Sequence, residues 1–153
     1  MDINHNRTAA PNVHAALAPM HLSMGCHSLA GARSFYGELL GCAERRATAT
    51  SVHLDWFGSQ LTLHEVEGYN ARSLHCEVDA EDVPVPHFGA ALDEASFHAA
   101  ADRLTRAGWS FVLQPHRRFL GKGWEQWVLF VLDPSGNAIE LKSFTQLPPG
   151  SWR

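Results

Sequence analysis

Apolar and polar residues alternate in four short segments of the chain. These segments are residues 20–26, 60–64, 87–92 and 138–142. In the first, His21, Ser23 and Gly25 alternate with apolar neighbours. Successive side chains of a β-strand point to opposite faces, so the segments predict strands with one apolar face beneath helices and one small, polar face. The polar face carries His21, His64, His87 and Glu140.

Apolar residues recur at helical spacing in two further segments. Ser28 and Asp93 predict the N-caps of these helices, and Gly41 and Gly108 predict their ends. Each helix follows a polar-faced strand and precedes three more strands. The later strands are expected at residues 43–47, 51–56 and 59–65, and at residues 109–113, 125–132 and 137–144. We therefore predict an α+β fold of two βαβββ modules that form a curved mixed sheet, with helices on its outer face.

The two modules are expected to make a single domain over residues 20–145, at about 20–66 and 86–144. The linker at residues 67–85 is charged and turn-forming, and its V-P-V-P segment excludes a central strand or helix. We predict a connecting arm there. Residues 1–19 are predicted to be a mobile N-terminal tail, and residues 146–153 a C-terminal tail.

The segment D-P-S-G-N predicts a tight hairpin before the last strand. Pro134 presets its backbone angle, while Gly136 and Asn137 tolerate positive φ. A shift of one residue in register would turn Glu140 into the apolar layer, where an unpaired charge is costly. The hairpin is therefore expected to aim Glu140 at the polar face.

Composition narrows the class of protein. The chain has 153 residues, 45% of them hydrophobic, and a formal charge of -4. No basic stripe exists beyond Arg117, Arg118 and Lys122, which argues against a nucleic-acid partner. Three cysteines without paired spacing, and an N-terminal segment without a continuous apolar run, favour a cytoplasmic protein that neither is exported nor inserts into a membrane.

With both modules and the four polar positions in view, the chain resembles the vicinal oxygen chelate superfamily, which includes glyoxalase I, fosfomycin-resistance enzymes, bleomycin-binding proteins and extradiol dioxygenases. The segments A-R-S-F-Y-G-E-L-L-G and D-P-S-G-N-A-I-E-L-K-S-F carry this resemblance. The segments D-W-F-G-S-Q-L-T-L-H, V-P-V-P-H-F-G and Q-P-H-R-R-F look like a subgroup of small predicted dioxygenases. The resemblance implies a sheet cupped around a metal ion.

Carried over by position, the resemblance implies His21, His87 and Glu140 as metal ligands. Two histidines and a carboxylate suit Fe(II) in non-haem oxygenases, with Mn, Ni or Zn as other candidates. His64 fits three roles: a fourth ligand, a base beside the metal, or a histidine satisfied at the wall of the cup. The ligand set also has a structural interpretation, as polar residues in a metal-free fold like that of bleomycin-binding relatives.

Other residues are candidates for contact with the substrate. The loop at residues 114–123 has the glycine-flanked composition of a lid, and Arg118 within it suits a substrate carboxylate or phenolate. His116 is a candidate general base, or else structural. Trp56 lines an aromatic pocket in one interpretation and the core in another. Glu125 and Gln126 point to opposite faces, so only one can meet the ligand; Gln126 is the working candidate.

The sequence thus predicts a metal-dependent enzyme of dioxygenase type. Its substrate would be a small aromatic diol or hydroxy or keto acid that chelates the metal through neighbouring oxygens. The alternatives are a metal-dependent isomerase, lyase or transferase like glyoxalase or the fosfomycin-resistance enzymes, and a metal-free protein that sequesters a drug. The resemblance also implies a homodimer.

Overall fold

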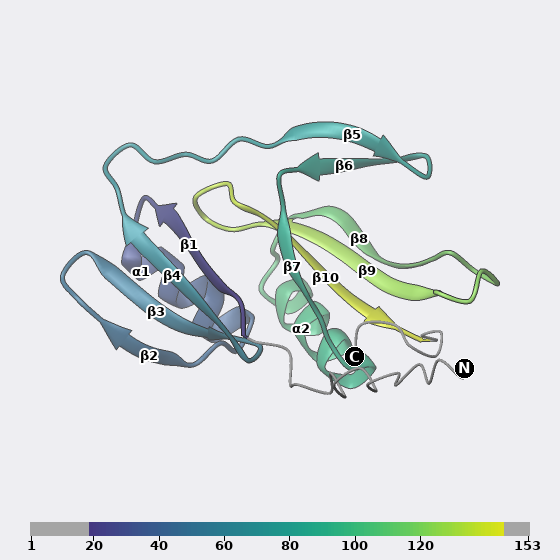
Figure 1. Cartoon of the computed structure of the whole chain (residues 1–153), viewed down its shortest axis with the longest axis horizontal. Helices are drawn as coiled ribbons and strands as arrows, with labels where there is room; N and C mark the ends of the chain where they lie inside the picture. The colour runs from purple at the N-terminus through teal and green to yellow at the C-terminus, as the bar shows by residue number, and fades with distance from the viewer. Residues whose placement is uncertain (1–18, 146–153) are drawn as a thin grey trace, which may run out of the picture.

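The computed structural model of the chain describes residues 19–145, which form two modules of the same topology (Figure 1). The elements of the first module are β1 (His21–Cys26), α1 (Leu29–Ala32), the π-helical η1 (Arg33–Leu39), β2 (Glu44–Ala47), β3 (Ser51–Trp56) and β4 (Ser59–Glu65). Those of the second are β7 (Phe88–Ala91), α2 (Glu94–Arg106), β8 (Phe111–Arg118), β9 (Gln126–Leu132) and β10 (Ala138–Phe144). The predicted tails at residues 1–18 and 146–153 lie outside the described residues.

The two sheets repeat one strand order, β1-β4-β3-β2 and β7-β10-β9-β8. In each sheet the first strand runs parallel to the last strand of its module, β1 beside β4 and β7 beside β10. The other pairs are antiparallel. This arrangement confirms the predicted α+β fold of two βαβββ modules.

Both predicted helix starts are confirmed. The Ser28 side chain accepts a hydrogen bond from the Gly31 backbone amide at 3.2 Å, and Asp93 accepts one from Ser96 at 2.8 Å. The first helix is not α-helical throughout, since it widens into η1. There the Leu40 amide donates to the Phe35 carbonyl at 3.1 Å, one residue further back than in an α-helix.

The linker between the modules differs from the prediction of a plain connecting arm. It contains an antiparallel hairpin of β5 (Leu74–Val78) and β6 (Glu81–Val85), here called the hairpin arm. Pro84 is tolerated in it because β6 pairs only with β5 among residues 19–145, so no further ladder needs its missing amide hydrogen. The hairpin arm lies over the second sheet (Figure 1), where Val83 packs in a small cluster with Val128 and Phe130.

The predicted lid at residues 114–123 is also shorter than expected. β8 continues through Arg118, opposite Gln126 of β9. A register shift between Leu113 and His116 accommodates Pro115 within the strand. Pairing with β9 therefore overrides the local turn signal, and only the segment after Arg118 forms the loop.

One core joins both modules. Trp56 at the end of β3 lies 5.2 Å from the ring of Phe88, and its indole nitrogen donates to the Gly89 carbonyl at 3.3 Å. The largest buried side chains of this core include Phe35, Tyr36, Leu54, Leu63, Phe97, Leu104, Ile139 and Leu141. Since these residues lie on the helix-facing sides of both sheets, the two polar faces turn away from the shared core.

Two of the three cysteines have the buried side chains expected of a structural role. Cys26 and Cys42 are buried and Cys76 is exposed, all unpaired. Burial, and secondly the charge of Asp55, raises the pKa of Cys42 to about 12. Within residues 19–145, no helix has the length and apolar character needed to cross a membrane.

Candidate metal centre

His87 and Glu140 meet on the polar face of the second sheet. His87 directly precedes β7, and β7 pairs with β10 so that Gly89 lies opposite Glu140. The Nε2 atom of His87 is 3.7 Å from a carboxylate oxygen of Glu140, whose side chain is 10% exposed. These two groups are therefore positioned to bind one cation.

The ring of His87 is fixed by its surroundings. Its Nδ1 atom lies 2.6 Å from the Pro84 carbonyl, and its ring makes a T-shaped contact with Phe130, with 5.1 Å between the ring centroids. In the neutral tautomer that donates from Nδ1 to that carbonyl, Nε2 carries the lone pair that a cation would bind. This is the common arrangement of a metal-binding histidine, in which the other ring nitrogen donates to a carbonyl or carboxylate.

Glycine at position 89 lets the two strands approach. A Cβ atom there would lie 2.9 Å from the carbonyl carbon of Glu140 and 3.1 Å from its Cβ atom, and closer still to its carbonyl oxygen. Real Cβ atoms essentially never approach backbone atoms this closely. The close approach of Glu140 to His87 therefore requires a residue without a Cβ atom at position 89.

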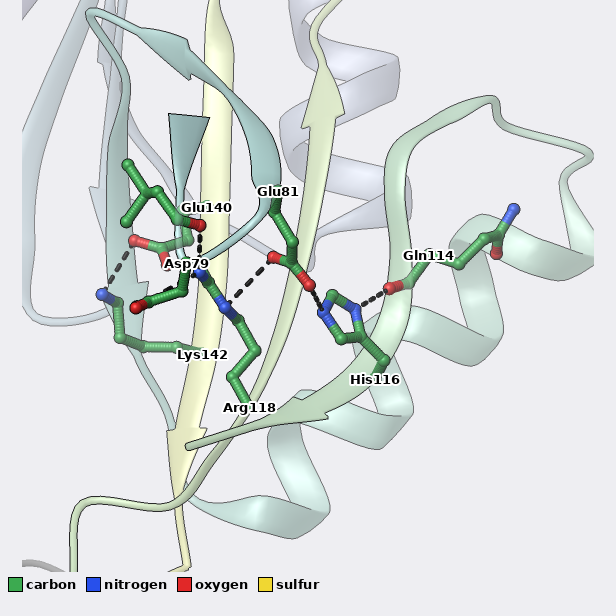
Figure 2. Close-up of polar contacts among 8 residues, drawn as sticks. Asp79, Glu81, Gln114, His116, Arg118, Glu140 and Lys142 are labelled. Carbon is green, nitrogen blue, oxygen red and sulfur yellow. Dashed lines mark hydrogen bonds and ion pairs between the residues drawn. The ribbon is translucent and has the colours of Figure 1, made fainter. Parts of the chain in front are cut away.

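Lys142 holds the carboxylate of Glu140. The ammonium group is 2.8 Å from an oxygen of Glu140, and the lysine side chain is 25% exposed (Figure 2). The two residues are separated by one position on β10, so both project from the same face. A cation that bound Glu140 would compete directly with this ion pair.

The side chains of His116 and Arg118 are bound to the hairpin arm and are not free to contact a ligand at Glu140. Figure 2 shows Glu81 between them, and Arg118 Nε lies 3.1 Å from Glu81 Oε2. Arg118 also donates to the Val78 carbonyl at 2.8 Å, and it is almost fully buried. The guanidinium group of Arg118 already has protein acceptors, and its role as an anion clamp stays a prediction. His116 likewise contacts Glu81 and the Gln114 carbonyl through its two ring nitrogens.

The polar face of the first sheet carries its own histidines. The Nδ1 atom of His21 is 2.8 Å from Gln60 Oε1, and both side chains are exposed. His53 lies beside them, 3.0 Å from the Thr62 hydroxyl. Partial desolvation, followed by the charges of Arg46, His64 and His21, lowers the pKa of His53. His53 is therefore favoured in its neutral form.

The parallel register separates His64 from His21. His21 lies opposite Gln60, whereas His64 lies opposite Gly25, four positions further along β4. Four strand residues span about 13 Å. Within one chain Gln60, not His64, is therefore the neighbour of His21. The alternation placed Gln60 on the correct face, but only the register shows which polar residue of β4 is the neighbour.

The remaining candidates for substrate contact are Trp56, Gln126 and Glu125. Trp56 is only 2% exposed and belongs to the core, because it follows Val52 and Leu54 on the helix-facing side of β3. Of its two interpretations, this placement favours the core. Gln126 is buried opposite Arg118 and Phe144, on the same face as Glu140. Glu125, its rival, accepts from the Gly121 amide at 3.2 Å and so holds the loop.

No three His, Cys, Asp or Glu side chains gather as a metal site within the described part of one chain. His87 and Glu140 come together, but His21 and His64 do not join them. A cavity of about 380 Å³ lies beside His87, with apolar walls that include Leu22 and Phe88 and with Arg72 on its lining. The single chain thus presents two ligands of a candidate metal centre and a neighbouring cavity.

Comparison with known proteins concerns the chain as a whole. A family model described as the Glyoxalase/Bleomycin resistance protein/Dioxygenase superfamily matches residues 19–141. No curated protein matches the chain.

Several solved structures resemble the chain. A glyoxalase/bleomycin resistance protein/dioxygenase from Alicyclobacillus acidocaldarius is 28% identical with a TM-score of 0.67, over 85% of this chain and 93% of that one. A fosfomycin resistance protein from Listeria monocytogenes is 12% identical with a TM-score of 0.59, over 82% and 92%. A lactoylglutathione lyase from Agrobacterium tumefaciens is 15% identical with a TM-score of 0.55, over 84% and 95%. The last two likenesses concern the fold alone.

Proposed function

Because the chain belongs to the Glyoxalase/Bleomycin resistance protein/Dioxygenase superfamily, we propose that it is a metal-dependent enzyme of dioxygenase type. Its substrate is a small molecule that chelates the metal through two neighbouring oxygens, such as an aromatic diol or a hydroxy or keto acid. The observation that carries this proposal is the pairing of His87 Nε2 with the Glu140 carboxylate at 3.7 Å on a partly buried polar face.

The donor atoms of this pair fit Fe(II). An imidazole nitrogen and a carboxylate oxygen are two of the three ligands of the two-histidine, one-carboxylate site, which leaves positions open for substrate and oxygen. Mn, Ni and Zn accept the same donors. When bound, the metal would supply Lewis acidity to the substrate oxygens and, in the case of iron, electrons for oxygen. Phe130 lies against the ring of His87, and Val83 of the hairpin arm packs against Phe130.

We also propose that the third ligand is His21 from a second copy of the chain, so that the working form is a homodimer. His21 is exposed on a polar face, and the shared core holds the polar faces of the two modules apart within one chain. The hairpin arm adds apolar surface for a dimer contact, with Leu74 79% exposed. A two-fold axis would bring each first module to the second module of the other copy and form two equal sites.

A Lewis-acid reaction is the second candidate. It is supported by the 2.8 Å contact between His21 and Gln60, because the Gln60 carbonyl oxygen offers a fourth protein ligand. Four protein ligands leave fewer positions for oxygen and favour an isomerase, lyase or transferase with Ni, Zn or Mn. The metal-free binding protein stays a prediction that metal analysis tests.

Reconstitution with iron tests the enzyme proposal. Untagged protein loaded with Fe(II) under argon is expected to bind one iron per chain and to consume oxygen with a catechol or hydroxy acid from a substrate panel. Glu140→Ala is expected to weaken iron binding on the order of 100-fold or more, because it removes a ligand. Glu67→Ala removes an exposed carboxylate and should leave iron binding and oxygen consumption unchanged. An intact iron site without oxygen uptake would reject the oxygenase and favour the Lewis-acid reaction.

Mixing two inactive variants tests the shared site. His21→Ala and Glu140→Ala homodimers each lack a ligand in both sites. Unfolded together and refolded as a mixture, they form heterodimers in which one of the two sites has all its ligands. About a quarter of all sites should then bind metal with native affinity, given random pairing. If His21 and Glu140 do not serve a common site, or serve one within a single chain, the mixture will bind no better than its components.

A further inference from the structure

Resting on the metal site proposed above, we propose that Lys142 couples metal binding to the binding of an anionic substrate. In the metal-free protein its ammonium group neutralises Glu140. Once a metal ion takes Glu140, the same ammonium group is left to pair with a negatively charged oxygen of the chelating substrate. The substrate class is accordingly an anionic chelator, such as a catecholate or a hydroxy or keto acid, rather than a neutral diol or ketone.

The geometry places Lys142 within reach of the substrate. Its nitrogen lies 2.8 Å from a Glu140 oxygen (Figure 2), and a bound metal sits about 2.1 Å from such an oxygen. Before displacement, the ammonium group thus lies within about 5 Å of the position that the ion would take. Substrate oxygens occupy the same coordination sphere, at a similar distance from the metal. A four-carbon side chain crosses the remaining gap by rotation about its own bonds.

Within the described part of the chain, Lys142 has no ion pair with an acidic residue other than Glu140. Of the nearby carboxylates, Glu81 lies between His116 and Arg118, and Asp79 faces Arg118. Among residues 19–145, Glu140 is the carboxylate that pairs with Lys142. The strand neighbours of Lys142 are Ala91 and Val128, which are apolar. The side chain of Lys142 is only 25% exposed. When a metal ion displaces it from Glu140, its positive charge is therefore left unpaired and partly desolvated.

Two opposite effects follow from this displacement. Without substrate, the positive charge of Lys142 opposes metal binding, both by occupying Glu140 and by repulsion between like charges. With an anionic chelator present, Lys142 attracts the ligand and the repulsion is offset. The affinities of metal and anion are then linked, and each must raise the other by the same factor.

Cobalt titrations test this coupling at constant pH. Co²⁺ is added to the full chain and its absorption in the visible region is recorded, with and without oxalate, after correction for the binding of Co²⁺ by oxalate itself. Lys142→Met is expected to bind Co²⁺ about tenfold more tightly than the unaltered protein when oxalate is absent. The increase in Co²⁺ affinity that oxalate produces should be about tenfold smaller in this variant.

Two further variants serve as controls. Lys142→Arg keeps the charge and should retain most of the coupling, while Lys122→Met removes an exposed lysine from the loop after β8 and should behave as the unaltered protein. Circular dichroism of each metal-free variant identifies any loss of folding. If Lys142→Met binds Co²⁺ but shows the same oxalate effect as the unaltered protein, the role of Lys142 is rejected and the metal site stands. If the unaltered protein binds no Co²⁺, both proposals are overturned.

Discussion

Asp133→Ala is expected to lower the free energy of unfolding by about 3 kcal/mol or more, because it leaves several buried donors without an acceptor. Asp133 is 4% exposed. Its carboxylate accepts from the Tyr36 hydroxyl, the backbone amides of Ser135 and Asn137, and the Asn137 side chain, each at 2.8 Å. Burial and the charge of Asp133 raise the pKa of Tyr36 well above its ordinary value, so its hydroxyl stays protonated and donates.

The loss of stability in Asp133→Ala should affect more than the turn at residues 133–137. Tyr36 belongs to the first module and Asp133 to the second, so the hydrogen bond between them joins the two. The same carboxylate orders the turn that precedes β10 and thereby sets the register of Glu140. Urea denaturation followed by tryptophan fluorescence measures the change. Asp102→Ala, an exposed position on α2, is the matched control and should change stability by less than about 0.5 kcal/mol. An equal effect of both substitutions would contradict this account of Asp133.

Gly89→Ala is expected to destabilise the protein by about 3 kcal/mol and to weaken metal binding at the same time. The added methyl group would overlap the Glu140 carbonyl, which is backbone and cannot rotate away. The strands must therefore separate, at the cost of overpacking strain and lost ladder hydrogen bonds. Because His87 directly precedes β7 and Glu140 lies on β10, the distance between the two side chains should exceed the 3.7 Å observed.

The control for this substitution adds the same methyl group where there is room. A Cβ atom at Gly37, in η1, would find its nearest neighbour, the Cys42 carbonyl oxygen, at 3.9 Å. Gly37→Ala should be neutral or stabilising by up to about 1 kcal/mol, since alanine favours a helix. Thermal unfolding and Co²⁺ titration of both variants measure the two effects. A Gly89→Ala protein with native stability and native Co²⁺ affinity would show that close approach of the strands is not required.

Part of the site followed from local sequence signals. Alternation placed Glu140 on the polar face of its strand, and the D-P-S-G-N turn predicted the hairpin that precedes it. The N-caps at Ser28 and Asp93 marked helix starts that the structure confirms. Each of these features is set by a few consecutive residues, through backbone preference or strand and helix periodicity, and can therefore be recognised in the chain without its partners.

Other features depend on contacts between distant segments. The contacts of Glu81 with His116 and Arg118 join residues that are more than thirty positions apart in the sequence. No local sequence pattern links these residues. The pairing of His21 with Gln60 depends on a register between two parallel strands that are separated by a helix and two further strands. Alternation defines a face but not a position along it, which is why His64 was an equally good candidate in the sequence.

The two βαβββ modules, and the face of each strand that carries imidazole or carboxylate, can be predicted from the chain because strand and helix periodicities are local. Which of those groups meet depends on the packing of distant segments. The tertiary structure brought His87 to Glu140 through the parallel pairing of β7 with β10, assigned Arg118 to the hairpin arm, and held His21 apart through a core shared by both modules. Those outcomes depend on how sheets pack and pair over long distances in the chain, where many registers satisfy the same alternation of side chains.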